Sequence, residues 1–113
     1  MKVEELVPIP DIKALFKLSA YKAVPNSSGC YVLTTYDDYI LYIGLTDNLL
    51  MRFQQHIDNP VKTKPNVEGK AIWFYYKLYN SKKLNFLERT WINQFVAVHG
   101  NLPILNKVNS PII

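Results

Sequence analysis

The sequence predicts a small α+β domain in which a three-stranded antiparallel sheet is flanked by helices. Two β-rich runs, 30–36 and 39–43, flank Asp37-Asp38, a pattern typical of a β-hairpin. A third run at 70–79 has apolar residues on both faces and predicts another strand. The length of 113 residues suits one domain, and segments with helical apolar spacing surround the strands.

The first 23 residues are predicted to form an N-terminal extension with one short helix, and residues 24–113 to form the domain. Val7–Pro10 favours an extended start because each residue before a proline avoids the helical region. Asp11 can cap the helix. Its apolar positions would be Ile12, Leu15, Phe16 and Leu18.

The hairpin predicts a pair of facing tyrosines. If the turn is centred near Asp37, Tyr31 and Tyr42 lie roughly opposite each other. Gly44 is two residues beyond Tyr42 and shares its face. We expect the missing side chain of Gly44 to leave room for a ligand or another backbone.

Two helices are predicted after the hairpin. Thr46 or Asp47 can cap the first, over about 48–58, where Arg52 and His56 are neighbours on one edge because they are four residues apart. Its apolar stripe is Leu49, Leu50, Phe53 and Ile57. A basic loop over 58–69 follows. Asn80 or Ser81 can cap a long helix that ends before Gly100, and the apolar segment 102–106 is expected to dock.

Glu88 breaks the pattern of the long helix. At 100° per residue it falls inside the apolar stripe of Leu84, Leu87, Trp91 and Phe95. Burying an unpaired carboxylate costs several kcal/mol. The chain must therefore supply a cation, a metal, a proton or a solvent-filled cleft. A structural ion pair, with Arg52 or a lysine, and a metal-binding or catalytic acid are the two interpretations.

Charge is distributed unevenly along the chain. Residues 1–60 hold five basic and seven acidic residues, a net of −2, whereas residues 61–113 hold eight and two, a net of +6. This asymmetry favours nucleic acid as a partner, with an ordinary solubility charge as the alternative. The longest apolar run, 71–76, is far shorter than a membrane span of roughly 18 residues. With a single cysteine, Cys30, the sequence favours a reduced, cytoplasmic protein.

Several of these residues, taken in sequence order, match the motifs of a known protein family. Gly29-Cys30-Tyr31, ten further residues and then Tyr42-Ile43-Gly44 resemble the paired signature of the GIY-YIG nuclease superfamily. Arg52 and Glu88 follow on successive predicted helices, and 103–106 is similar to the closing Pro-x-x-Asn of that family. The resemblance covers about three quarters of the chain and implies a small sheet flanked by helices.

The resemblance implies a metal-dependent endonuclease that hydrolyses DNA phosphodiester bonds. Tyr31 and Tyr42 would line the active site, where one of them would hold or deprotonate the attacking water. Arg52 would bind the scissile phosphate, and Glu88 would be the sole side-chain ligand of Mg²⁺ or Mn²⁺. A lone carboxylate suits Mg²⁺, which keeps several waters and binds substrate phosphates.

Supporting roles follow from the same resemblance. His56 is similar to a histidine of restriction-type members and would relay a proton, and Asn106 would support the site or the phosphate. A tyrosine with an ordinary pKa near ~10 is a poor base at neutral pH. Arg52, Lys77 or the metal would have to lower that pKa.

Several residues are candidates for contacts with the nucleic acid. Gly44 leaves space there, and the contacts with the DNA backbone are assigned to Lys62, Lys64, Lys70, Lys82 and Lys83. Leu45 is a departure, because many relatives carry a basic residue at this position. Either His56, Lys62 or Lys64 replaces the lost charge, or activity is weakened.

Three functions remain open. The first is a stand-alone endonuclease of DNA repair or recombination, whose specificity comes from DNA shape, a homodimer or a protein partner. The second is a nucleic-acid-binding module of the same fold that has lost cleavage, which only Leu45 favours. The third is a structural domain that binds proteins. DNA binding separates the third from the others, and cleavage separates the first two.

Overall fold

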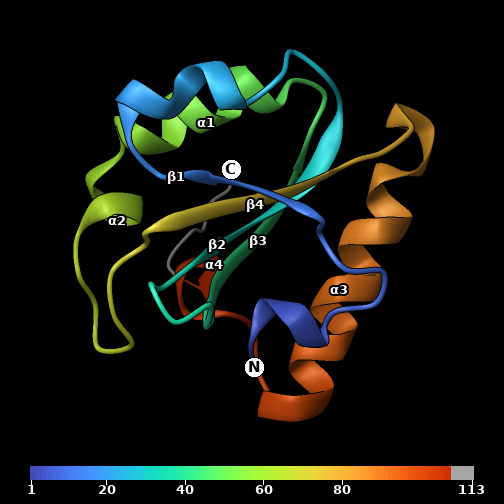
Figure 1. Cartoon of the computed structure of the whole chain (residues 1–113). Helices are drawn as coiled ribbons and strands as arrows, with labels where there is room; N and C mark the ends of the chain where they lie inside the picture. Colours follow the sequence, from blue (N-terminus) through green and yellow to red (C-terminus); the bar gives the residue numbers. More distant parts are fainter. Residues whose placement is uncertain (108–113) are drawn as a thin grey trace.

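The computed structural model describes residues 1–107. Its centre is a four-stranded antiparallel sheet with the strand order β1-β4-β2-β3 (Figure 1). The strands are β1 (Ile12–Leu15), β2 (Gly29–Thr34), β3 (Ile40–Thr46) and β4 (Trp73–Leu78). The helices are α1 (Leu49–Ile57), α2 (Pro60–Thr63), α3 (Leu84–His99) and α4 (Ile104–Lys107), with 3₁₀ turns η1 (Val3–Glu5), η2 (Leu18–Ala23) and η3 (Ser81–Lys83). The predicted α+β class is confirmed, but the sheet has four strands, not three.

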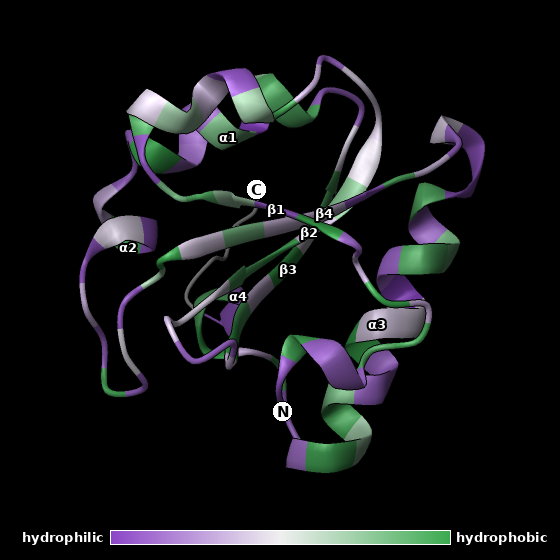
Figure 2. Ribbon diagram, viewed as in Figure 1, coloured by the Kyte–Doolittle hydropathy of each residue, from purple (hydrophilic) through white to green (hydrophobic). Residues whose placement is uncertain are grey.

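The sheet is buried on both faces because its strands are apolar on both faces. One face packs against α1 and η2, and its buried core includes Tyr31, Phe53 and Phe74. The other face packs against α3 and the N-terminal turn, with Val32, Trp91 and neighbouring residues in its core. Figure 1 shows these two helical layers on either side of the strands, and Figure 2 shows green, apolar stretches along the strands and α3.

The predicted N-terminal helix is wrong over Ile12–Leu15, which forms β1 and pairs with the outer edge of β4. Ala14 and Phe16, two residues apart, are buried in the core on the α1 face, whereas Ile12 and Leu15 are exposed. Short apolar runs fit the spacing of a strand and of a helix equally well. Here the segment forms a strand because it pairs with the free edge of β4. A 3₁₀ helix, η2, follows instead. The predicted domain, 24–113, extends beyond the described residues.

The predicted hairpin is present, but its register differs from the expected one. Tyr31 pairs with Gly44, and Leu33 pairs with Tyr42, so the two tyrosines are diagonal neighbours. The pairing is irregular between Leu33 and Thr34. This irregularity and the wide turn shift the partner of Tyr31 by two residues. The ring centroids of Tyr31 and Tyr42 are nevertheless 5.9 Å apart.

Local capping chemistry explains the start of α1 and the end of α3, but α3 starts after Lys83, which makes no side-chain capping bond, and the predicted cap Asn80 caps η3 instead. The N-cap of α1 is Asn48, not Thr46 or Asp47, because the Asn48 side chain accepts a hydrogen bond from the Met51 amide. Gly100 ends α3 as predicted, with a left-handed backbone at φ 81°. The predicted loop 58–69 contains the one-turn helix α2, which begins at Pro60. None of the helices within residues 1–107 has the length and apolar character needed to cross a membrane.

The reactivity of the buried Cys30 thiol tests whether the sheet is buried as described. Burial raises the pKa of this thiol to about 12, with a smaller contribution from the charge of Glu88. We expect a thiol reagent at pH 8 to label the folded chain more than about a hundredfold slower than the chain in denaturant, because only the thiolate of an exposed cysteine reacts. Complete labelling of the native chain within seconds would contradict the buried position.

Candidate active site

Tyr31 is the most deeply buried member of the site, with none of its side chain exposed. A Cβ atom on Gly44 would lie 2.5 Å from the Tyr31 hydroxyl oxygen. The space that we expected to be open for a ligand is therefore filled by this hydroxyl. The hydroxyl is hydrogen-bonded to Nε2 of His56 at 2.7 Å, which ties β2 to α1.

The Tyr31–His56 pair is electrically neutral in the folded chain. Burial raises the pKa of Tyr31 well above its usual value; the neighbouring Tyr42 adds to the shift and Arg52 opposes it. Burial, together with the cations Lys62 and Arg52, lowers the pKa of His56 to about 3. At neutral pH, Tyr31 keeps its proton and His56 is uncharged.

Tyr42 is the tyrosine that solvent can reach, since its side chain is only half-buried. Its ring centroid is 5.3 Å from that of His56. Burial raises the pKa of Tyr42, the hydrogen-bonding partner Tyr31 and the charge of Arg52 lower it, and the charge of Glu88 raises it. The pKa of Tyr42 therefore depends on charged side chains of both α1 and α3. Lys77 pairs with Cys30, on the α3 face of the sheet, and not with Tyr31.

Arg52 projects from α1 toward the end of β3. Its Nε donates a hydrogen bond to the Gln55 side chain at 3.0 Å, and its Nη1 donates to the Leu45 carbonyl at 3.5 Å. These contacts use two of the five N–H donors of a guanidinium. The remaining donors are available to a phosphate, which a guanidinium can bind in a bidentate manner.

Glu88 lies on α3, which packs against β2 and β3 on the other face of the sheet, and its charge acts on the pKa of Tyr42. Its side chain is half-buried. Burial raises the pKa of its carboxyl, and the cation that opposes this shift is Arg89, the next residue in the chain. The charge that acts on Glu88 is thus not Arg52, the partner considered in the structural ion-pair interpretation. A half-buried carboxylate with this weak compensation fits the interpretation as a functional acid.

Asn106, on α4, supports the edge strand of the sheet. Its Oδ1 accepts a hydrogen bond from the Ile43 amide at 3.0 Å, and its Nδ2 donates to the Ile43 carbonyl at 2.9 Å. The Asn106 amide therefore occupies the place of a neighbouring strand residue beside β3. β3 is the last strand of the sheet, so this pair satisfies backbone groups that would otherwise face solvent.

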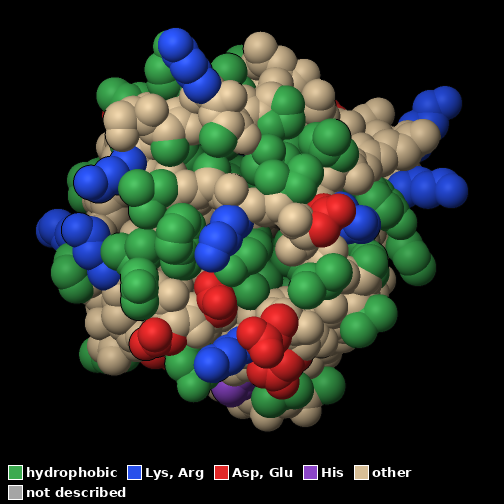
Figure 3. Space-filling model, in the orientation of Figure 1, with side chains coloured by type: hydrophobic (Ala, Val, Ile, Leu, Met, Phe, Trp, Pro, Cys, Tyr) green, Lys and Arg blue, Asp and Glu red, His purple; other side chains and the backbone are tan. Residues whose placement is uncertain are grey.

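The predicted DNA-contacting lysines divide into two groups. Lys64, Lys70, Lys82 and Lys83 are exposed. Lys62 is buried, with 4% of its surface exposed, and its Nζ lies 4.6 Å from the ring centroid of Tyr42. On the face shown in Figure 3, Lys and Arg side chains are scattered, while Asp and Glu side chains gather in the lower part of the view. Leu45, the departure from the family pattern that the sequence indicated, packs against the core on the α3 face.

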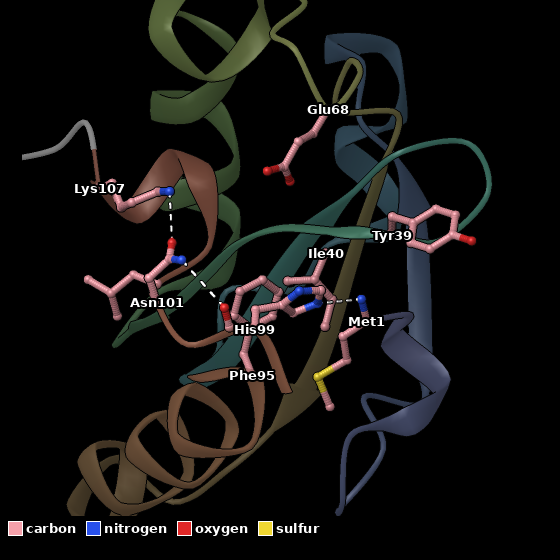
Figure 4. A pocket seen from close by; sticks show the side chains of 9 residues that line it. Met1, Tyr39, Ile40, Glu68, Phe95, His99, Asn101 and Lys107 are labelled. Atoms are coloured by element: carbon pink, nitrogen blue, oxygen red, sulfur yellow. Dashed lines mark hydrogen bonds between the residues drawn. The ribbon is translucent and has the colours of Figure 1, made fainter. Parts of the chain in front are cut away.

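A separate cavity of about 430 Å³ lies at the C-terminal end of α3 (Figure 4). Phe95 and His99 of α3 line it, together with Met1 and Glu68. It includes none of the predicted catalytic residues. Within residues 1–107, no group of three or more His, Cys, Asp or Glu side chains could hold a metal ion. A metal at the candidate site would therefore rest on Glu88 and on oxygens supplied by substrate and water.

Residues 27–101 match the GIY-YIG catalytic domain, a match that covers both tyrosine strands, Arg52 and Glu88. The chain belongs to the GIY-YIG family. Members of this family are nucleases. The match confirms the resemblance found in the paired tyrosine motifs.

One relative extends over most of this GIY-YIG chain. The UvrABC system protein C of Aster yellows witches'-broom phytoplasma (strain AYWB) is 29% identical to it over 98 residues. The match covers 85% of this chain and 16% of the relative. The chain therefore spans less than a fifth of the length of that relative.

The sequence placed the two tyrosines, Arg52, His56 and Glu88 on the elements where they are found, but it missed the helix α4 that carries Asn106 and two contacts. It brought Tyr31, Tyr42 and Gly44 to one face of the hairpin, and it did not foresee that Tyr31 would occupy the space at Gly44. It also treated Lys62 as a surface residue. Lys62 lies two residues after Pro60, which starts a helical turn, and this position was the available signal for a different environment.

Substitution of Gly44 tests the close packing of the site. In Gly44→Ala, the new methyl group would collide with the end of the Tyr31 ring, so we expect a loss of about 1–3 kcal/mol in the free energy of unfolding. In a Tyr31→Leu background, which lacks the ring end, the same change should cost less, and Tyr42 Cε2, 2.9 Å from the new Cβ, is the close contact that remains. Urea unfolding of the four chains measures both values, and equal costs in the two backgrounds would refute the contact.

His56 makes the stability of the fold depend on pH, with lower stability at lower pH. Its pKa is about 3 in the folded chain and near ~6.5 when unfolded, so the unfolded state binds more protons between these values and stability falls as the pH falls. Between pH 7 and pH 5, wild type should lose about 2 kcal/mol more than His56→Gln. Urea unfolding at both pH values tests this, and identical losses would show that His56 is not buried in its neutral form.

Proposed function

We propose that this chain is a divalent-metal-dependent endonuclease that hydrolyses DNA phosphodiester bonds. The observation that carries the proposal is the arrangement around β3, where Arg52 of α1 donates to the Leu45 carbonyl and α3, which carries Glu88, packs against the same strand. Both charges act on the pKa of Tyr42, although Arg52 lies on α1 and Glu88 on α3. A positive group, a carboxylate and a solvent-accessible hydroxyl at one strand edge suit phosphodiester hydrolysis.

The reaction needs charge stabilisation. An oxygen of water bonds to phosphorus, the bond from phosphorus to one bridging sugar oxygen breaks, and that oxygen takes a proton. Negative charge develops on the phosphate oxygens and on the leaving oxygen. The guanidinium of Arg52, already oriented by Gln55 and the Leu45 carbonyl, can stabilise this charge without reorganisation.

The two tyrosines have different exposures and so different roles. Tyr31 is fully buried and bound to His56, so we assign it to positioning, as the group that fixes α1 against the hairpin. Tyr42 is half-buried and faces the charged groups, so we assign it to the attacking water. Burial holds the pKa of Tyr42 above its usual value, and Arg52 opposes this shift. Tyr42 can therefore orient the water and accept its proton only when further positive charge is bound.

The donor set fits Mg²⁺ or Mn²⁺. Glu88 would hold the ion, with phosphate oxygens and waters as the other ligands, and a single carboxylate with substrate oxygens is sufficient for Mg²⁺. When bound, the ion supplies positive charge beside the phosphate. The site lacks the nitrogen and sulfur ligands that Zn²⁺ prefers, since His56 is engaged with Tyr31.

We assign the substrate to DNA whose shape departs from a regular duplex, such as flaps, forks and junctions. Exposed Lys64, Lys70, Lys82 and Lys83 carry charge that suits phosphate contacts, and such contacts position a protein without reading bases. Specificity would then come from DNA shape, from a second copy of the chain or from a protein partner. We also propose that this cleavage serves DNA repair or recombination.

Cleavage of a panel of labelled nucleic acids tests this function. We expect cutting of one or more DNA substrates (supercoiled plasmid, duplex, flap, fork, four-way junction) with Mg²⁺ or Mn²⁺, and none with EDTA. Glu88→Gln should cut at least about a hundredfold more slowly, while Glu4→Gln, an exposed acid on η1, serves as the matched control. Because burial disfavours its charge, the loss of Glu88 should leave thermal stability unchanged or raised.

Two outcomes would contradict the proposal. Cutting that persists in EDTA or in Glu88→Gln would remove the metal site from Glu88. Salt-sensitive binding without cutting would identify a binding module that has lost cleavage, the function that Leu45 favours. An RNA duplex and a single-stranded RNA in the same panel separate DNA from RNA as the substrate.

A further inference from the structure

Lys62 lies where a lysine is rarely found. It belongs to the one-turn helix α2, which begins at Pro60 and is capped by the side chain of Asn59. This turn packs beside α1 and places Lys62 against the ring of Tyr42, with Nζ 4.6 Å from the ring centroid. Only 4% of the residue is exposed.

The charge of Lys62 is incompletely compensated in the free chain. Burying an ammonium group is costly unless an opposite charge is nearby, and the face of an aromatic ring offsets only part of that cost. Within residues 1–107, the charged side chain that acts on Lys62 is Arg52, which is also a cation. Burial and this like charge both lower the pKa of Lys62.

Among residues 1–107, the polar side chains beside Tyr42 on this face, His56 and Tyr31, supply no negative charge. His56 is neutral, because burial and the two cations lower its pKa to about 3. Tyr31 is protonated, because burial raises its pKa well above the usual range. Glu88, on α3, acts on the pKa of Tyr42 but is not among the charges that act on Lys62. Two cations therefore flank Tyr42 on the α1 face, an arrangement that an anion bound between them would stabilise.

We propose that Lys62 is a second phosphate-binding residue of the active site, which contacts the same phosphodiester group as Arg52. The inference rests on the proposed function, since it assigns a contact within that site. Lys62 then differs in kind from the four exposed lysines, which would contact flanking phosphates along the DNA. A bound phosphodiester is the counter-charge that the buried Lys62 and the half-buried Arg52 would share.

This assignment also bears on Leu45. A basic residue at position 45 would project to the α3 face, where the Leu45 side chain packs. Lys62 lies on the α1 face, against Tyr42. Lys62 therefore adds a cation from another direction and does not take the position that Leu45 leaves without charge.

A purely structural role makes a different prediction. If Lys62 served only to cover Tyr42 with its aliphatic stem, a methionine of similar length would preserve function as well as packing. If the ammonium serves an anion, Lys62→Met removes the function while the fold keeps or gains stability, because a buried, poorly compensated charge is lost.

The test compares wild type, Lys62→Met and Lys62→Arg, with Lys22→Met, an exposed lysine on η2, as the matched control. The probe is a fluorescent flap DNA, with binding measured by anisotropy in EDTA at several salt concentrations. We expect Lys62→Met to bind about tenfold more weakly and to reduce the salt dependence by about one phosphate contact. Thermal unfolding should be unchanged or shifted upward, and Lys62→Arg should recover most of the binding.

Cleavage of the same DNA with Mg²⁺ supplies the second readout, where Lys62→Met should lower the rate by about a hundredfold. Unchanged binding and cleavage in Lys62→Met would overturn the inference. Equal losses in Lys62→Met and Lys62→Arg, accompanied by a lower unfolding temperature, would also overturn it and assign Lys62 to packing.

Failure of the inference can be distinguished from failure of the proposed function. If wild type binds the flap DNA but does not cut it, the nuclease assignment fails and the binding comparison still decides the role of Lys62. If wild type cuts and Lys62→Met matches it, only the inference fails. If wild type binds no DNA in EDTA at low salt, the phosphate contact is refuted directly.

Discussion

The contact between the Tyr31 hydroxyl and the backbone of Gly44 is the constraint on which the site depends. Any side chain at position 44 would collide with Tyr31, because a Cβ there lies 2.5 Å from its oxygen. With this space filled, the hydroxyl reaches His56 and fixes α1 against the hairpin. Arg52, one helical turn before His56, is then held beside the end of β3. The paired tyrosine motif thus has a structural role, which is to hold α1 against the hairpin, in addition to any role in catalysis.

The site is concentrated at β3 because this strand is the edge of the sheet and is reached from three sides. Arg52 approaches from α1, Glu88 from α3 and Asn106 from α4. A central strand could not accept such a set, since both of its edges are occupied by neighbours. The edge also brings unlike charges near one half-buried hydroxyl. Their separation by the sheet lets a carboxylate and a guanidinium act on Tyr42 without pairing with each other.

The sequence predicted the features that depend on local rules and on an ordered motif. The hairpin, α1 and α3 followed from apolar periodicity and from turn and stop residues such as Gly100. β1 was missed because four residues with exposed Ile12 and Leu15 carry no strand signal of their own; the open edge of β4 selects them. The register shifted because the irregularity near Thr34 depends on tertiary packing. The burial of Lys62 could not be predicted, because lysine side chains are usually exposed and the sequence does not show that Lys62 packs on the ring of Tyr42.

The most direct measurement is a structure of Glu88→Gln bound to a flap or duplex DNA, in which slow cleavage preserves the substrate. The account predicts that one phosphodiester lies beside Tyr42, within hydrogen-bonding distance of both Arg52 and Lys62, with position 88 facing it from α3. DNA held only by the exposed lysines, with no phosphate near Arg52 or Tyr42, would contradict the account. Such a result would leave the Tyr31–His56 frame as a structural element of the fold alone.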